Sequence, residues 1–326
     1  MAVLRIEIPI TVYSQENVTK LQDFFHDFSM PVQLLDEDVV FKLHLTINER
    51  ITDQSTHEYK VYVSLSTEIT GTVDIDKNLF CTGKICKHTY SDRDGQMQTV
   101  EWPGNYELDE LISEDVKDIA FGFVMAMILG DPSIDASGIR VTIYIDEVVL
   151  YRKILLQYNM HNQAVWEYPS LFTEQLSLQQ SWEWINKNTS IYGKHDISPM
   201  YFSALTYMLA RDYHEAVLYG VIGLENLYAT KNEKGILERL KKRIPLVLPT
   251  VELQMIKDLY RIRSDVVHGK MQLGICFSWR EIYETDDVYE RQGVFATALL
   301  LASIRKLIVQ NATTINFTEK VEHSYE

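Results

Sequence analysis

Apolar and polar residues alternate along four segments in the first half of the chain. A period of two is typical of β-strands that bury one face. The segments are also rich in β-branched and aromatic residues, which favour a pleated, half-buried strand. The predicted strands are Leu4–Val12, Val39–Ile47, Tyr59–Leu65 and Val141–Ile145.

Two segments between these strands have the pattern of helices. Asn17–Phe28 is the shorter one. The longer one, Ser113–Leu129, has Ser113 in the N-cap position and acidic residues in its first turn, where they favour the positive end of the helix dipole. Gly130-Asp131-Pro132 is expected to end it. We therefore expect an α+β domain over residues 1–170, whose topology the pattern leaves open.

The pattern changes near Pro169, and apolar residues then recur every three or four positions, as in helices with one buried face. Pro245 is expected to end one of these helices and Gly269 to cap another. The sequence predicts an all-α helical bundle over residues 171–326. Its helices are Glu174–Asn188, Pro199–Arg211 with Ser198 as N-cap, Asp212–Ala229, Lys234–Ile244, a helix from Thr250 or Val251 to His268, and Val288–Asn311.

Charge is distributed unevenly between the two halves. The chain has 31 basic and 46 acidic residues and a net charge of −15. Residues 1–170 hold 13 basic and 27 acidic residues, or −14, whereas residues 171–326 hold 18 and 19, or −1. Because an acidic surface repels nucleic acid, any RNA site is expected in the second half. The acidic first half could shield such a site.

Several function classes lack their usual motifs. There is no Walker A, G-x-S-x-G, H-E-x-x-H or G-x-G-x-x-G sequence, so no cofactor is expected. Cys81, Cys86 and His88 have no fourth ligand at a typical spacing, so no metal site is expected either. No apolar run has the length of a membrane span and the N-terminus lacks a signal-peptide pattern, which predicts a cytoplasmic protein.

One arginine lies on an apolar face of the helix that ends near His268. Arg263 falls on a stripe formed by Ile256, Tyr260 and Val267, beside a second apolar stripe on the same helix. A guanidinium group in such a position is costly unless it is paired. We therefore expect Arg263 to have a partner.

His268 lies at the C-terminal end of the same helix, where the partial negative charge favours a protonated imidazole. Five residues of helix advance by about 500°, so the side chains of Arg263 and His268 point about 140° apart. A straight helix does not direct both at one atom. A bent helix end or a second subunit would.

The segment Arg263-Ser-Asp-Val-Val-His268 matches the R-x4-H motif of HEPN domains. Upstream, Ala210–Tyr228 resembles the first long helices of that family, with Glu225 as its glutamate, and Ile236–Ile244 resembles its short connector helix. The wider motif resembles the ApeA-like branch of the family, through Leu259, Tyr260, Arg263, Ser264, Val267, His268 and Gly269. The resemblance covers about 140 residues, under half of the chain.

The resemblance implies a metal-independent endoribonuclease that acts as a homodimer, often in bacterial defence against phage, with two motifs meeting across the dimer interface. His268 would move protons while the RNA 2′-hydroxyl attacks the adjacent phosphate. Arg263 would stabilise the charge that develops on the phosphoryl oxygens. The expected supporting residues are Tyr260, Ser264, Asp265 and Glu225.

The alternative hypothesis is a non-catalytic HEPN scaffold that binds RNA or a partner protein. Many active HEPN nucleases have Asn, Asp or His after the arginine, and this chain has Ser264 there. In the alternative, Arg263 pairs with Glu225 inside the bundle and His268 only caps its helix. The α+β domain would then, as in the first reading, sense a trigger, restrain the helical domain or recruit a protein partner.

A basic segment precedes the motif. Lys231–Arg243 carries six basic residues and two acidic ones. Lys241, Lys242 and Arg243 are the candidate contacts to RNA phosphates. The competing explanation is an ordinary solvated helix face.

Overall fold

The computed structural model describes residues 2–12, 14–34, 37–51, 57–69, 85–91, 97–103, 107–134, 140–145, 148–154, 160–188, 199–209, 213–229, 235–268 and 279–317. The chain divides into two compact units. The first comprises Met1–Phe123 and Arg140–Ile154, and the second comprises Val124–Ile139 and Leu155–Glu326. The expected boundary near residue 170 lies inside the second unit.

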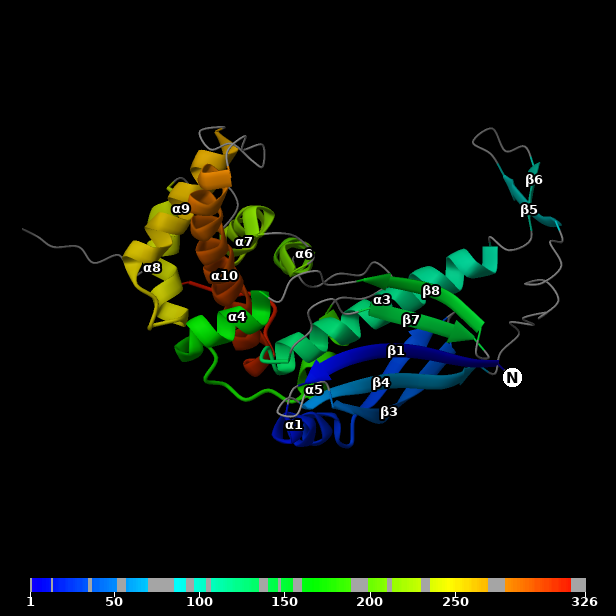
Figure 1. Cartoon of the computed structure of the whole chain (residues 1–326). Helices are drawn as coiled ribbons and strands as arrows, with labels where there is room; N and C mark the ends of the chain where they lie inside the picture. The colour runs from blue at the N-terminus through cyan, green and yellow to red at the C-terminus, as the bar shows by residue number, and fades with distance from the viewer. Residues whose placement is uncertain are drawn as a thin grey trace, which may run out of the picture. The chain divides into compact units, whose positions relative to one another are not determined.

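The first unit contains an antiparallel six-stranded sheet with the order β2-β3-β4-β1-β7-β8. A separate two-stranded hairpin, β5–β6, follows β4 in the sequence. The N-terminal strand β1 lies inside the sheet, between β4 and β7 (Figure 1). The strands are β1 Ala2–Val12, β2 Ser29–Leu34, β3 Glu37–Ile51, β4 His57–Ile69, β5 Ile85–Ser91, β6 Met97–Pro103, β7 Arg140–Ile145 and β8 Val148–Ile154.

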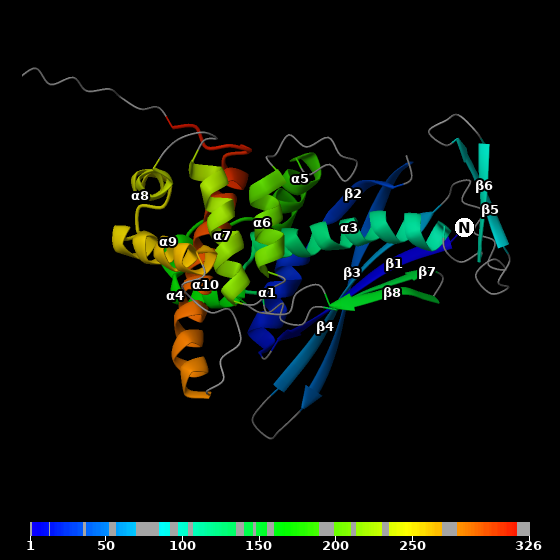
Figure 2. The same ribbon diagram turned by 90° about the horizontal axis from the view of Figure 1, so that it is seen from above.

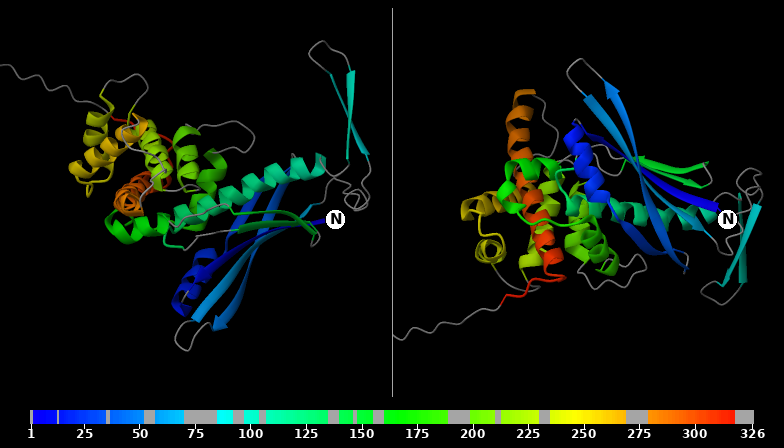
Figure 3. Two further views of the ribbon diagram at one scale, coloured as in Figure 1. Left: turned by 45° about the horizontal axis from the view of Figure 1, so that its top comes forward. Right: turned by 90° about the horizontal axis from the view of Figure 1, so that it is seen from below.

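The alternating pattern has the expected effect: one face of this sheet is buried. Leu4, Ile6 and Ile8 are fully buried, while the residues between them are partly exposed. Helix α1, Gln15–Phe25, and the first part of helix α3, Glu107–Gly130, lie on the buried face (Figure 3). Phe123 of α3 packs against the rings of Phe25 and Phe28, with centroids 6.3 Å and 5.6 Å apart. The polar face of the sheet is the opposite one.

The second unit is helical and is organised around α10. Between Val294 and Ile308 every residue of α10 except Lys306 is buried. Helices α4, α5, α6, α7 and α9 all contact it (Figures 1 and 2). The helices of this unit are α4 Met160–Glu167, α5 Leu178–Asn188, α6 Pro199–Leu209, α7 Tyr213–Tyr228, α8 Ile236–Val247, α9 Leu253–Val267 and α10 Trp279–Val309, with a short 3₁₀ turn at Pro169–Leu171.

Helix α10 also explains the one apolar segment long enough to cross a membrane within the part of the chain that the structure describes. This segment is Val288–Val309, and 83% of its most apolar window is buried inside the protein. Such burial is typical of the core helix of a soluble protein.

Helices α7 and α10 approach each other closely because α7 carries glycines at the contact. A Cβ atom added to Gly220 would lie 2.7 Å from the Cβ of Ala296, and one added to Gly223 would lie 2.7 Å from a methyl group of Leu300. At the end of the same contact, the hydroxyl groups of Tyr228 and Ser303 are hydrogen-bonded at 2.8 Å. The small residues therefore fix where α7, which carries Glu225, lies against the core.

A buried arginine links three segments of the helical unit. Arg305 of α10 is 3% exposed. Its guanidinium donates hydrogen bonds to the carbonyl groups of Leu129 and Gly130, the last residues of α3, and to that of Glu174. The neighbouring Lys306 pairs with the Glu174 carboxylate. Burial lowers the pKa of Arg305, whereas Asp131 and Glu174 oppose this effect. The Arg305 guanidinium thus provides hydrogen-bond donors for carbonyl groups at the C-terminus of α3. The helix dipole also favours a positive charge at this end of the helix.

Several helix boundaries differ from the sequence prediction, and α10 begins at Trp279 rather than at Val288. Helix α8 does not end before Pro245 but continues to Val247. A proline in the last turn can keep a helical φ. After it, the backbone N–H of Leu248 donates a hydrogen bond of 2.8 Å to the carbonyl oxygen of Ile244. Helix α3 begins at Glu107, so Ser113 lies inside it rather than at its N-cap. Helix α1 ends at Phe25, before Asp27, whose φ of 56° interrupts the helix.

Replacing Gly220 by alanine should destabilise the protein by about 1–3 kcal/mol, because the new methyl group overlaps the Cβ of Ala296. An exposed helical glycine would instead gain about 1 kcal/mol from the same change. The free energy of unfolding, measured by urea denaturation, decides between these signs. The double variant Gly220→Ala/Ala296→Gly should recover most of the loss, and its failure to do so would contradict the close approach.

Candidate functional site

Helix α9 packs one apolar face on the bundle and leaves Arg263 at the edge of that face. Ile256, Leu259, Ile262 and Val266 are buried, whereas Arg263 is partly exposed. This burial agrees with the spacing of three and four residues in the sequence. Helices α7, α8 and α10 all contact α9. Figure 1 shows α8 and α9 side by side. The arginine therefore lies where α9 meets α7.

Arg263 has the partner that its position predicts. Its Nη2 lies 3.4 Å from Oε1 of Glu225 on α7, and the two side chains are 23% and 19% exposed. Its guanidinium carbon also lies 5.7 Å from the centre of the Tyr260 ring. The distance to Glu225 permits an ion pair, but Oε1 receives no hydrogen bond of good geometry. The attraction between the two groups is thus mainly coulombic.

The electrostatic surroundings of Glu225 are unfavourable for its charge. Burial raises the pKa of this carboxyl group, and the charge on Arg263 lowers it only in part. The guanidinium is therefore needed to hold a half-buried carboxylate. Three of the residues singled out in the sequence, Tyr260, Arg263 and Glu225, come together here.

His268 lies apart from this group. It is the C-cap residue of α9, and its backbone N–H donates to Ser264 O at 2.9 Å. The residue is exposed. Within the ranges that the structure describes, no hydrogen bond or ion pair engages its imidazole or joins it to Arg263. This arrangement is in keeping with the angle of about 140° between the two positions on a straight helix.

The other two supporting residues are half-buried. Ser264 follows Arg263 and supplies the carbonyl group that caps the helix. Asp265 lies near Tyr289 of α10, whose pKa is raised by burial and by the Asp265 charge. Tyr289 is fully buried and was missed in the sequence, where it is one aromatic residue among many at the start of a long helix. It links the end of α9 to the core.

The basic segment before α9 contributes one solvent-facing cation among its three candidates. Lys242 is exposed. Lys241 donates to both carboxylate oxygens of Glu238, at 2.7 Å and 2.8 Å. Arg243 is 5% exposed, donates to Tyr228 O at 2.7 Å and lies over the Phe317 ring at 5.0 Å. These contacts give Arg243 a structural role in place of the expected phosphate contact.

No group of three His, Cys, Asp or Glu side chains that could hold a metal ion occurs among the residues whose positions are described. The side chains of Cys81, Cys86 and His88 lie outside those residues. Comparisons of the chain with protein-family models, curated proteins and solved structures find no match. The resemblance to HEPN domains therefore rests on the residues of α7 and α9 themselves.

The raised pKa of Glu225 predicts a pH dependence of stability. A carboxyl group whose pKa is higher in the folded state than its ordinary value of 4.5 favours folding at low pH, and this contribution is lost as the pH rises through the folded-state pKa. The free energy of unfolding of wild type should thus fall relative to that of Glu225→Gln as the pH rises above 4.5. Urea denaturation of both proteins from pH 4 to pH 7 measures the difference; a constant difference would contradict the assignment.

Proposed function

We propose that the helical unit is a HEPN-type endoribonuclease domain that cleaves RNA without a metal ion. The observation that supports this most is the end of α9, where a guanidinium fixed by Glu225 and Tyr260 precedes an exposed histidine by five residues. The two side-chain types match the two tasks of the reaction. A bacterial defence or toxin role in the cytoplasm is the setting that the resemblance implies.

The chemistry needs a group that moves protons and a fixed positive charge. The 2′-hydroxyl of RNA attacks the neighbouring phosphate, its proton leaves, and the 5′-oxygen of the next nucleotide departs with a proton. His268 is accessible to solvent and can accept and return these protons. Arg263 can stabilise the phosphoryl oxygens, whose negative charge increases in the transition state. Neither task requires a cofactor.

A homodimer fits the geometry of α9. Arg263 and His268 of one chain face different directions, so one active site would combine Arg263 of one copy with His268 of another. Mixing Arg263→Ala with His268→Ala protein should then restore cleavage, because each mixed dimer contains one intact pair. Two sites built within single chains would give no recovery.

A second candidate function is favoured by the ion pair itself. Because Arg263 already neutralises Glu225, a non-catalytic HEPN scaffold for RNA or a protein partner accounts for the same contact. In a scaffold, the loss of Arg263 affects stability, and the loss of His268 affects neither stability nor an RNA cleavage rate.

The deciding experiment is cleavage of labelled single-stranded RNA in EDTA. Arg263→Ala and His268→Ala should each lower the rate by roughly 100-fold or more. Arg261→Ala is the matched control, since Arg261 is an exposed arginine of the same helix that pairs only with Asp258, at 3.3 Å, in the contacts described. Wild-type activity in this control is expected. Equal rates in all four proteins, or no cleavage by any of them, would favour the scaffold.

The N-terminal unit is the proposed regulator, through its acidic surface or through a protein partner. Its influence is best tested without truncation at residue 170. Such a cut removes α4, which packs on α10, and the α3 carbonyl groups that Arg305 binds. The helical unit would lose part of its own core, and its activity would report on folding as well as on regulation.

A further inference from the structure

The polar face of the N-terminal sheet carries a row of cations and small hydroxyl residues in fixed register. On β3 and β4, Lys42 lies opposite Ser66 and His44 lies opposite Ser64. On the other side of β4, Ser66 lies opposite Arg5. Since neighbouring strands are about 4.8 Å apart, Lys42 and Arg5 stand on strands about 10 Å apart with the two serines between them.

The side chains of this row are accessible to solvent. Lys42 and His44 are exposed, and Ser64 and Ser66 are partly exposed. Among the contacts described for this part of the chain, no hydrogen bond or ion pair involves the side chains of these four residues. Tyr62, two positions before Ser64 on the same strand, is on the same face and is also partly exposed.

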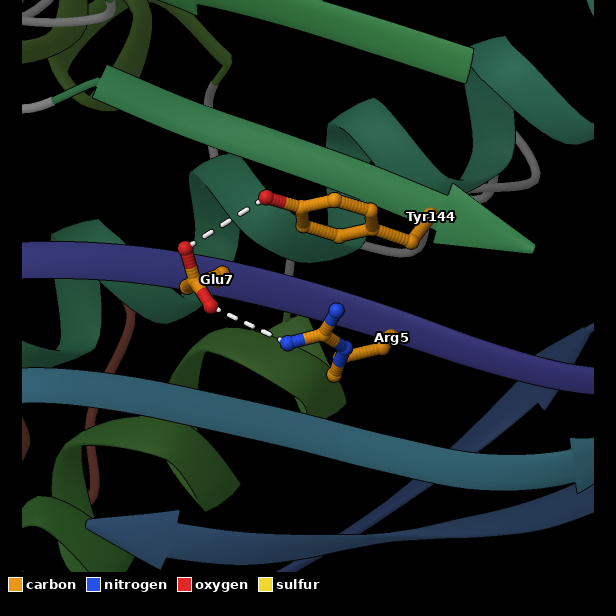
Figure 4. Close-up of polar contacts among 3 residues, drawn as sticks. All are labelled: Arg5, Glu7 and Tyr144. Carbon is orange, nitrogen blue, oxygen red and sulfur yellow. Dashed lines mark hydrogen bonds and ion pairs between the residues drawn. The ribbon is translucent and has the colours of Figure 1, made fainter. Parts of the chain in front are cut away.

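On β1, Arg5 lies opposite Ser66 and Glu7 lies opposite Ser64. Both belong to the polar cluster shown in Figure 4. Arg5 Nη1 donates to Glu7 Oε2 at 3.0 Å, and its guanidinium lies 4.2 Å from the centre of the Tyr144 ring. The Tyr144 hydroxyl reaches the other Glu7 oxygen at 3.5 Å. Glu7 is thereby held toward Arg5 and β7, and its carboxylate is neutralised on that side.

We propose that this face binds a small phosphorylated ligand of the mononucleotide type, with its phosphate over Ser66, between Lys42 on one side and Arg5 on the other. Ser64 and His44 are the next residues of this face on β4 and β3. Serine hydroxyls and flexible cations are the donors that phosphate oxygens accept from. The Tyr62 ring offers a surface on which a base can stack.

The charge of this half of the chain decides between a small ligand and a nucleic acid. Residues 1–170 carry a net charge of −14, so a polyanion meets repulsion along its whole length. A ligand with one phosphate needs only the local cations. The site lies outside the helical unit and does not depend on the ribonuclease proposal.

Isothermal titration calorimetry of the full chain with AMP tests the proposal. Adenosine and a short single-stranded RNA are the comparison ligands. AMP should bind and adenosine should not. Lys42→Ala should weaken AMP binding roughly tenfold, the effect of losing one charge-assisted hydrogen bond. Lys60→Ala, a lysine of the same face placed opposite Asn48 and away from the serines, should bind AMP as wild type does.

Ser66→Val provides a second variant that should fold well, because valine favours strands, and that removes the hydroxyl group between Lys42 and Arg5. It should abolish AMP binding while thermal stability is kept. The proposal is overturned if wild type does not bind AMP at millimolar concentration, if adenosine binds equally well, if Lys42→Ala and Lys60→Ala behave alike, or if RNA competes with AMP at the site.

Discussion

The helical unit depends on the burial of α10. Almost every residue of α10 between Val294 and Ile308 is buried and most of them are apolar, so other helices must surround this part of the helix. Each fully buried leucine or isoleucine on it contributes about 1.5–3 kcal/mol relative to its exposed state. The glycines of α7 then set how closely that helix can approach, and Tyr228 fixes its far end through Ser303. The position of Glu225 follows from this packing.

Burial also creates the electrostatic need that Arg263 meets. A carboxylate at the edge of the core loses hydration, and a guanidinium on the neighbouring helix restores part of the lost stability. The same guanidinium is the group proposed to hold an RNA phosphate. The two roles compete for one charge, and a phosphate that binds Arg263 must outweigh its attraction to Glu225.

The sequence predicted elements well where one face is buried and poorly where an element lies at an edge. Strands β1, β3, β4 and β7 alternate clearly, and they were predicted. Edge strand β2 contains Pro31, which breaks a strand pattern but is tolerated at a sheet edge. Edge strand β8 and the short helix α4 were missed too. For the α3 and α10 helices, the apolar part was found and the polar first turns were not.

Side-chain partners were harder to predict than elements. The need of Arg263 for a partner followed from its place on an apolar stripe. Glu225 was the partner predicted under the scaffold hypothesis. Arg243 lies in a basic segment that looks solvated, so its burial against Tyr228 and Phe317 depends on tertiary contacts that no local pattern contains. The same holds for Arg305, whose partners are more than 130 residues away.

The chemical nature of the RNA ends produced in EDTA distinguishes attack by the 2′-hydroxyl from hydrolysis. Attack by the 2′-hydroxyl leaves a 2′,3′-cyclic phosphate on one product and a 5′-hydroxyl on the other, and mass spectrometry distinguishes both from hydrolytic ends. If His268 moves the proton, wild type should produce cyclic phosphate ends and His268→Ala should produce none. Ends with a 3′-hydroxyl and a 5′-phosphate, or cyclic ends that persist without His268, would contradict this mechanism.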